Sequence, residues 1–176
     1  MKSVSLKTRA ILGSVLFLLA APGSVGGLIP WWISKWKPQP TPPGFWFVQL
    51  LGILVLAGSI LILLEAFARF ALQGVGTPAP VSPTRHLVVT GHYRYVRNPM
   101  YVAVVAAILG QSMILGNLTL LLYAAVVWLI THLFVVTYEE PTLRRKFGDE
   151  YAELCANVPR WIPRLRPWAG SAGRGR

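Results

Sequence analysis

The chain has 176 residues, of which 54% are hydrophobic and 13% are charged, and its mean hydropathy is +0.53. About a quarter of the residues of a soluble domain are charged, so this composition argues against that class and indicates a polytopic membrane protein. The net charge of +11 does not imply a nucleic-acid partner, because basic residues of membrane proteins set topology and contact anionic lipid headgroups. The single cysteine, Cys155, excludes an intrachain disulfide and any multi-cysteine metal site.

Four apolar segments are long enough to cross a bilayer, and we predict them to be membrane spans. They lie at residues 10–30, 44–66, 100–115 and 118–137. In the first segment, Pro22 and the glycines near it predict a kink. A tight turn at Gly116 and Asn117 joins the last two segments and makes them antiparallel. We therefore predict an all-α fold with about four transmembrane helices, forming a single membrane domain over residues 1–168.

The basic residues predict that both termini lie in the cytosol. Fifteen of them fall on the side that holds the termini, the loop 67–99 and the segment 138–168, whereas Lys35 and Lys37 fall on the other. This asymmetry follows the positive-inside rule and favours an even number of spans. It predicts an integral protein of the inner or plasma membrane with a cytosol-facing site, and we expect a disordered tail at 169–176.

After the fourth span, the sequence predicts a helix that lies along the membrane surface. Leu143, Phe147, Tyr151 and Leu154 are spaced by four, four and three residues, which gives the segment 142–155 one apolar face.

The segment Gly91–Tyr101 reads G-H-Y-R-Y-V-R-N-P-M-Y. Pro99 favours a helix start, because proline restricts the residue before it and fits the first helical turn. Free N–H groups at that helix start, with Arg94 and Arg97 nearby, suit a carboxylate or a phosphate. Plain positive-inside anchoring accounts for the two arginines equally well.

A pair of carboxylates, Glu139 and Glu140, follows the fourth span. If the helix ends there, both oppose its macrodipole, unless a cation binds them; a solvated helix end paired with Arg144 or Arg145 is the structural alternative. His132 lies seven residues earlier and so is expected on the same helical face as Glu139. It is either a site residue or a hydrogen-bonded packing histidine. The three histidines lack metal-ligand spacing, so we predict no metal.

The two polar segments bracket one membrane hairpin, so they converge at the same membrane surface. A ligand for this site carries both signs of charge, with an anionic end for arginine and a cationic end for glutamate. S-adenosylmethionine fits this description, and the apolar faces of the last two spans would admit a lipid acceptor from the side.

The C-terminal half, from Leu87 to Pro163, resembles the isoprenylcysteine carboxyl methyltransferases and the related phospholipid methyltransferases. The resemblance is carried by four motifs: Gly91-x-Tyr93-x-x-x-Arg97-Asn98-Pro99-x-Tyr101, Glu139-Glu140-x-x-Leu143, Phe147-Gly148-x-x-Tyr151 and Val158-Pro159-Arg160-Trp161-Ile162-Pro163. It implies S-adenosylmethionine as cofactor. The cofactor-binding residues that it implies are Gly91, Tyr93, Arg97, Asn98, Pro99, Tyr101, Glu139 and Glu140.

The chain departs from this family at Asn98, where histidine is usual. Asparagine still forms hydrogen bonds but does not titrate near neutral pH. As catalytic residues we predict Arg97, with Glu140 or His132 as the base when the acceptor is an amine or a thiol.

The predicted function is methyl transfer from S-adenosylmethionine to a membrane lipid or lipid-linked acceptor, such as an isoprenylcysteine carboxylate or a phospholipid amine. A membrane reductase with a nicotinamide cofactor and a non-catalytic membrane subunit are the alternatives. The sequence leaves open which acceptor is used and what the oligomeric state is.

Overall fold

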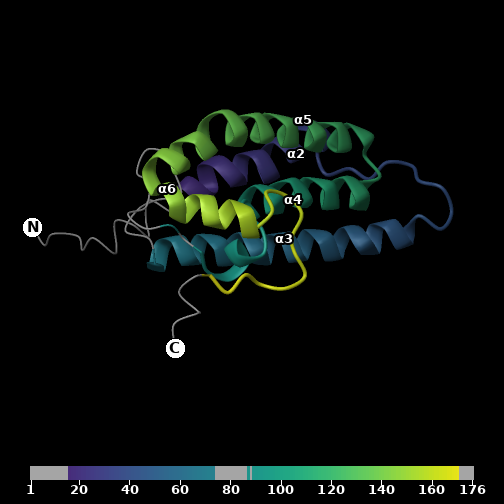
Figure 1. Ribbon diagram of the computed structural model, residues 1–176. Helices are drawn as coiled ribbons and strands as arrows, with labels where there is room; N and C mark the ends of the chain where they lie inside the picture. The colour runs from purple at the N-terminus through teal and green to yellow at the C-terminus, as the bar shows by residue number, and fades with distance from the viewer. Residues whose placement is uncertain (1–15, 74–86, 88, 171–176) are drawn as a thin grey trace, which may run out of the picture.

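The computed structural model describes residues 16–73, 87 and 89–170, and the regular elements in that part of the chain are all helical. Figure 1 shows them as a bundle in which α2, α4 and α5 lie above α3. The predicted all-α class is thus confirmed. Residues 10–15 of the first predicted span, residues 74–86 and 88 of the loop 67–99, and residues 171–176 of the predicted tail lie outside the described residues.

The first apolar helix runs over Leu16–Ser34. It contains η1 (Leu19–Leu28), a stretch of wide π-type turns, and then α2 (Ile29–Ser34). Pro22 lies inside η1 and has no backbone N–H to give to the helix, and interrupted hydrogen-bond ladders favour such turns. Where the sequence predicts a kink, the structure has widened turns, and the helix extends past Pro30.

The next two helices, α3 (Trp46–Gln73) and α4 (Pro99–Leu115), lie side by side, as Figure 1 shows. Their backbones come close where Gly52 faces Gly110. A Cβ atom built on Gly52 would lie 2.9 Å from the Gly110 carbonyl oxygen, and one on Gly110 would lie 2.9 Å from the Gly52 carbonyl oxygen. Small residues at such a crossing allow two apolar helices to pack in lipid, where the hydrophobic effect does not drive association.

A turn at Gly116 connects α4 to α5 (Leu118–Phe134). Gly116 has a φ of +62°, which favours glycine, and the Asn117 side chain caps α5 by accepting the Leu120 N–H at 3.2 Å. The chain then stays helical through η3 (Val135–Glu139) and α6 (Glu140–Asn157). Within α6, Gly148 has φ +50° and ψ −123° and kinks the helix, so its second half turns back under α5 (Figure 1).

Within the part of the chain that the structure describes, three helices are long and apolar enough to cross a membrane: Leu16–Ser34, Trp46–Arg69 and the stretch that begins at Leu118. The shorter apolar helix is Pro99–Leu115. Large apolar side chains cover the outside of the bundle; Leu61 on α3 is 68% exposed and Ile130 on α5 is 62% exposed. Apolar patches of this extent indicate contact with lipid rather than water, in agreement with the predicted polytopic membrane protein.

The close approach of α3 and α4 yields a test of the packing. We expect Gly52→Ala to lower the free energy of unfolding by about 1–3 kcal/mol, because its methyl group would overlap α4. The control is Gly58→Ala on the same helix, where an added Cβ meets no atom within 4 Å. SDS-titrated unfolding in mixed micelles measures both variants, and equal stabilities would show that the crossing tolerates the methyl group.

Candidate active site

One end of the bundle is closed by the turn η2 (Gly91–Arg94) and by residues 158–168, which follow α6 and include the C-terminal segment Val158–Pro163. Residues 158–168 run beside this turn and are held to the stretch 94–97 by backbone hydrogen bonds. The N–H of Arg97 donates to the Pro159 oxygen at 2.9 Å, that of Arg164 to the Tyr95 oxygen at 3.0 Å, and that of Trp168 to the Arg94 oxygen at 2.9 Å. Residues far apart in the sequence are thus brought to the start of α4.

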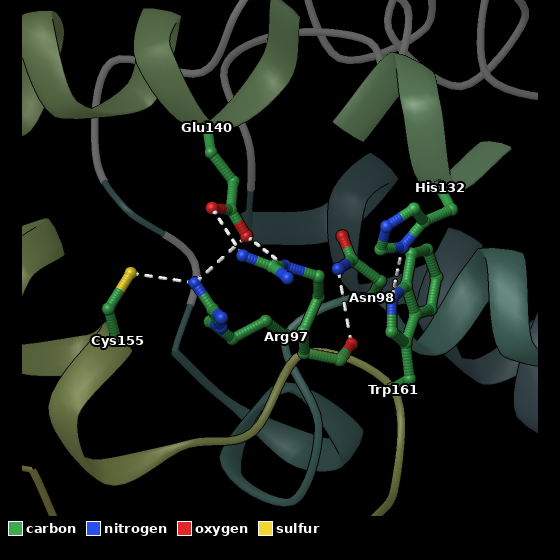
Figure 2. Close-up of polar contacts among 7 residues, drawn as sticks. Arg97, Asn98, His132, Glu140, Cys155 and Trp161 are labelled. Atoms are coloured by element: carbon green, nitrogen blue, oxygen red, sulfur yellow. Dashed lines mark hydrogen bonds and ion pairs between the residues drawn. The ribbon is translucent and has the colours of Figure 1, made fainter. Parts of the chain in front are cut away.

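A buried carboxylate, Glu140, lies at the centre of this end and binds two arginines (Figure 2). Arg160 donates from Nε to Oε1 at 2.6 Å and from Nη2 to Oε2 at 2.9 Å, while Nη1 of Arg97 lies 3.1 Å from Oε1. The Glu140 side chain is 8% exposed and that of Arg97 is 11% exposed. The hydrogen bonds to Glu140 raise the pKa of Arg160 above its usual value, so Arg160 stays charged at any physiological pH.

Arg97 makes one further contact, and one of its nitrogen atoms is buried without a partner among the described residues. Its Nη1 donates to the Cys155 sulfur at 2.7 Å, as Figure 2 shows. Its Nε is buried, and no hydrogen-bond partner for it exists among the described residues. A buried N–H without a partner is rare in a folded protein and suggests a group that is supplied from outside the chain.

A cavity of about 410 Å³ lies next to this cluster. Its polar part is formed by residues of the segment Gly91–Tyr101 and of the Glu139-Glu140 pair. These residues are Tyr93, Arg97, Asn98, Tyr101 and Glu139. Its walls are apolar and come from four helices; they include Phe17, Val25, Phe67, Val104, Val127 and Phe134. The Tyr101 hydroxyl donates to Oε2 of Glu139 at 3.1 Å, which orients this carboxylate within the cavity.

Tyr93 and Asn98 complete the polar part. Burial, together with the nearby Glu139 carboxylate, raises the pKa of the Tyr93 phenol well above its usual value, so Tyr93 stays protonated. The Asn98 amide donates from Nδ2 to the Arg160 oxygen at 3.2 Å (Figure 2). Pro99 lies in the first turn of α4, as predicted, and also lines the cavity.

The two neighbouring glutamates have different surroundings. Glu139 lines the cavity, whereas Glu140 does not line it and instead binds the two arginines. Consecutive residues of a helix point about 100° apart, so a pair in sequence does not act as a pair in space. Arg160 and Cys155 were not among the predicted site residues, because the contacts that place them join residues 20 or more positions apart in the sequence.

His132 and Gly91 also lie away from the cavity lining. His132 accepts the indole N–H of Trp161, with 3.0 Å between Nε1 and Nδ1. The expected common face with Glu139 is absent, because the π-type turns of η3 between them change the helical phase. Gly91 packs against Glu65 and Arg69, which form an i,i+4 ion pair.

A second, more polar cavity of about 630 Å³ borders Gly91. Four side chains that carry or can carry charge line it: Glu65, Arg69, His92 and Arg94. Glu65 also contacts Nδ1 of His92, at 2.6 Å from Oε2.

The sequence of the chain is similar to those of known proteins. The sequence model of the phospholipid methyltransferase family matches residues 47–150. The chain belongs to this family. Its members are membrane methyltransferases that use S-adenosylmethionine, which favours the methyltransferase prediction over the reductase and the non-catalytic subunit.

One relative extends this comparison. A protein-S-isoprenylcysteine O-methyltransferase of Schizosaccharomyces pombe is 42% identical to the chain over 80 residues, which cover 44% of this chain. The match spans about a third (34%) of that relative's length. The chain is therefore similar both to phospholipid methyltransferases and to an enzyme that methylates isoprenylcysteine.

The buried ion cluster yields a test of stability. We expect Glu140→Gln to lower the free energy of unfolding by about 3–5 kcal/mol, because Arg97 and Arg160 would be left close together without a counter-charge. Glu150→Gln, at an exposed position of the same helix, is the matched control and should change it by less than about 0.5 kcal/mol. SDS-titrated unfolding measures both, and a Glu140→Gln protein as stable as the control would show that the cluster does not stabilise the fold.

Proposed function

We propose that this protein transfers the methyl group of S-adenosylmethionine to a lipid or lipid-linked acceptor. The observation that carries the proposal is the 410 Å³ cavity, because groups of both charges meet apolar walls in it. A zwitterionic cofactor and an apolar acceptor need these two surfaces side by side. Family membership supports the same reaction.

The polar residues of the cavity match the charges of this cofactor. Arg97 lines the cavity and has a buried Nε–H without a partner among the described residues, which suits the carboxylate. Glu139, held by Tyr101, suits the ammonium group or the ribose hydroxyls. The cofactor residues predicted from the sequence therefore remain our proposal for Tyr93, Arg97, Asn98, Pro99, Tyr101 and Glu139, whereas Gly91 and Glu140 would act by shaping the site.

The bound cofactor would supply an electrophilic methyl group for in-line displacement by the acceptor. The chain would contribute alignment and electrostatics. A carboxylate acceptor needs no base, whereas an amine or a thiol must lose a proton. Both predicted bases are engaged, since Glu140 binds two arginines and Nδ1 of His132 accepts from Trp161. This arrangement favours an acceptor that is already a nucleophile in its common protonation state.

The orientation that we propose places the site at the cytosolic face of the inner or plasma membrane. The positive-inside bias of the sequence supports it. We also propose that anionic lipid headgroups contact this face, where Arg144, Arg145 and Arg166 are exposed.

Cofactor binding tests the proposal directly. We expect S-adenosylmethionine and its demethylated product to bind the detergent-purified protein in calorimetric titration. The Glu139→Gln variant should bind about 10- to 100-fold more weakly, because a hydrogen bond to a charged group in a buried site is lost. Glu150→Gln is the control for charge alone. Wild-type protein that is folded and lipid-supplemented but binds neither compound would refute the proposed function.

Product chemistry identifies the acceptor. With radiolabelled methyl donor and membrane extract, we expect a labelled lipid fraction that releases volatile methanol in base, because a carboxyl methyl ester hydrolyses whereas N-methyl and S-methyl bonds do not. Label that is stable to base would contradict a carboxylate acceptor and point to an amine or a thiol.

A further inference from the structure

The C-terminal segment Val158–Pro163 reaches the site from outside the membrane hairpin and is held by side chains of three different elements. Glu140 at the start of α6 binds the Arg160 guanidinium, and Asn98 at the start of α4 binds the Arg160 carbonyl. The third contact is made by α5, where His132 accepts the indole N–H of Trp161. Figure 2 shows these contacts on two neighbouring residues of the segment.

The surroundings of His132 are aromatic. Its ring stacks on Trp128, with 5.3 Å between centroids, and lies 5.9 Å from the ring of Trp161; the two tryptophans meet edge to face at 6.4 Å. An indole nitrogen only donates, so Nδ1 of His132 must be the unprotonated nitrogen of the imidazole ring. This bond gives the Trp161 N–H a partner at a place where the other neighbours are rings.

The position of Trp161 constrains Arg160, because the two residues are joined by one peptide bond. When Trp161 is fixed against α5, the Arg160 carbonyl is directed at Asn98 and its guanidinium at Glu140. Glu140 in turn holds Arg97, which lines the cavity. A continuous set of contacts therefore links the ring of His132 on α5 to the polar end of the cavity.

We propose that His132 is a positioning residue: by accepting the Trp161 indole N–H, it fixes the C-terminal segment so that Arg160 and Glu140 hold Arg97 in its cofactor-binding geometry. The part of this inference that concerns the cofactor rests on the proposed function. The part that concerns the segment does not, and it is testable without any ligand.

Limited proteolysis measures how firmly the segment is held. Trypsin cleaves after arginine, so cutting between Arg160 and Trp161 requires the segment to leave Glu140 and α5. Where opening and closing are fast, the cleavage rate follows the open population. We expect His132→Phe, which keeps a ring but has no acceptor, to raise the rate at this bond about fivefold in the full-length protein, as the loss of one hydrogen bond implies.

Matched variants separate the hydrogen bond from ring packing. His132→Asn carries an oxygen close to the position of Nδ1 and should restore slow cleavage. Trp161→Phe should speed cleavage as His132→Phe does, and the double variant should be no faster than either single one. Thr137→Val is the control on the following turn, because its exposed hydroxyl donates to the Leu133 oxygen of its own helix and is not part of the contacts that hold the segment.

Calorimetric titration of the demethylated cofactor product provides the second readout. We expect about fivefold weaker binding in His132→Phe and recovery in His132→Asn. Unchanged cleavage in His132→Phe and Trp161→Phe would overturn the role of His132 in holding the segment. If His132→Phe is cleaved faster but binds the product with unchanged affinity, the bond between His132 and Trp161 is purely structural. That result would overturn the positioning role of His132. Wild-type protein that fails to bind would refute the proposed function instead, while the cleavage result would still decide whether His132 holds the segment.

Discussion

The Glu140 carboxylate, held between Arg97 and Arg160, is the interaction on which the rest of this end of the molecule depends. A charged carboxyl group with 8% exposure is strongly unfavourable without partners. Its partners come from the turn before α4 and from the segment after α6, so neutralising one charge brings three parts of the chain together. The backbone bonds between Arg97 and Pro159 and between Tyr95 and Arg164 then fix their register.

This arrangement divides the work between two adjacent residues. Glu140 is committed to the fold, and for that reason Glu139 can face the cavity with Tyr101 as its neighbour. Arg97 shows the same division. Its Nη1 contacts Glu140 and Cys155, whereas its buried Nε has no hydrogen-bond partner among the described residues. The groups that we propose for cofactor binding are thus directed by contacts that do not involve a ligand, which is how a site is kept ready before the ligand arrives.

The helices were predictable because bilayer thickness and hydropathy set them locally. Pro99 gave the start of α4, and Gly116 gave the turn between α4 and α5. The contacts of Arg160 and Trp161 were not predictable, since they join segments whose separation in sequence carries no pattern. The helical face on which His132 lies was predicted wrongly for a different reason. A regular α-helix brings residues seven positions apart to the same face, but η3 widens the turns between His132 and Glu139. The residues Val135–Glu139 carry no sequence signal that predicts these wider turns.

Asn98 stands at the position where the resemblance noted in the sequence implies histidine, and its contacts show what the fold requires there. Its Nδ2 is committed to the Arg160 carbonyl, which leaves Oδ1 as the acceptor of this cavity-lining side chain. A neutral histidine offers the same pair of groups, one N–H donor and one nitrogen acceptor. The two residues therefore satisfy the same geometric constraint, and they differ in that histidine can gain a proton and lose its acceptor. In this chain the acceptor is permanent, so the polarity of the cavity at Asn98 does not change with pH.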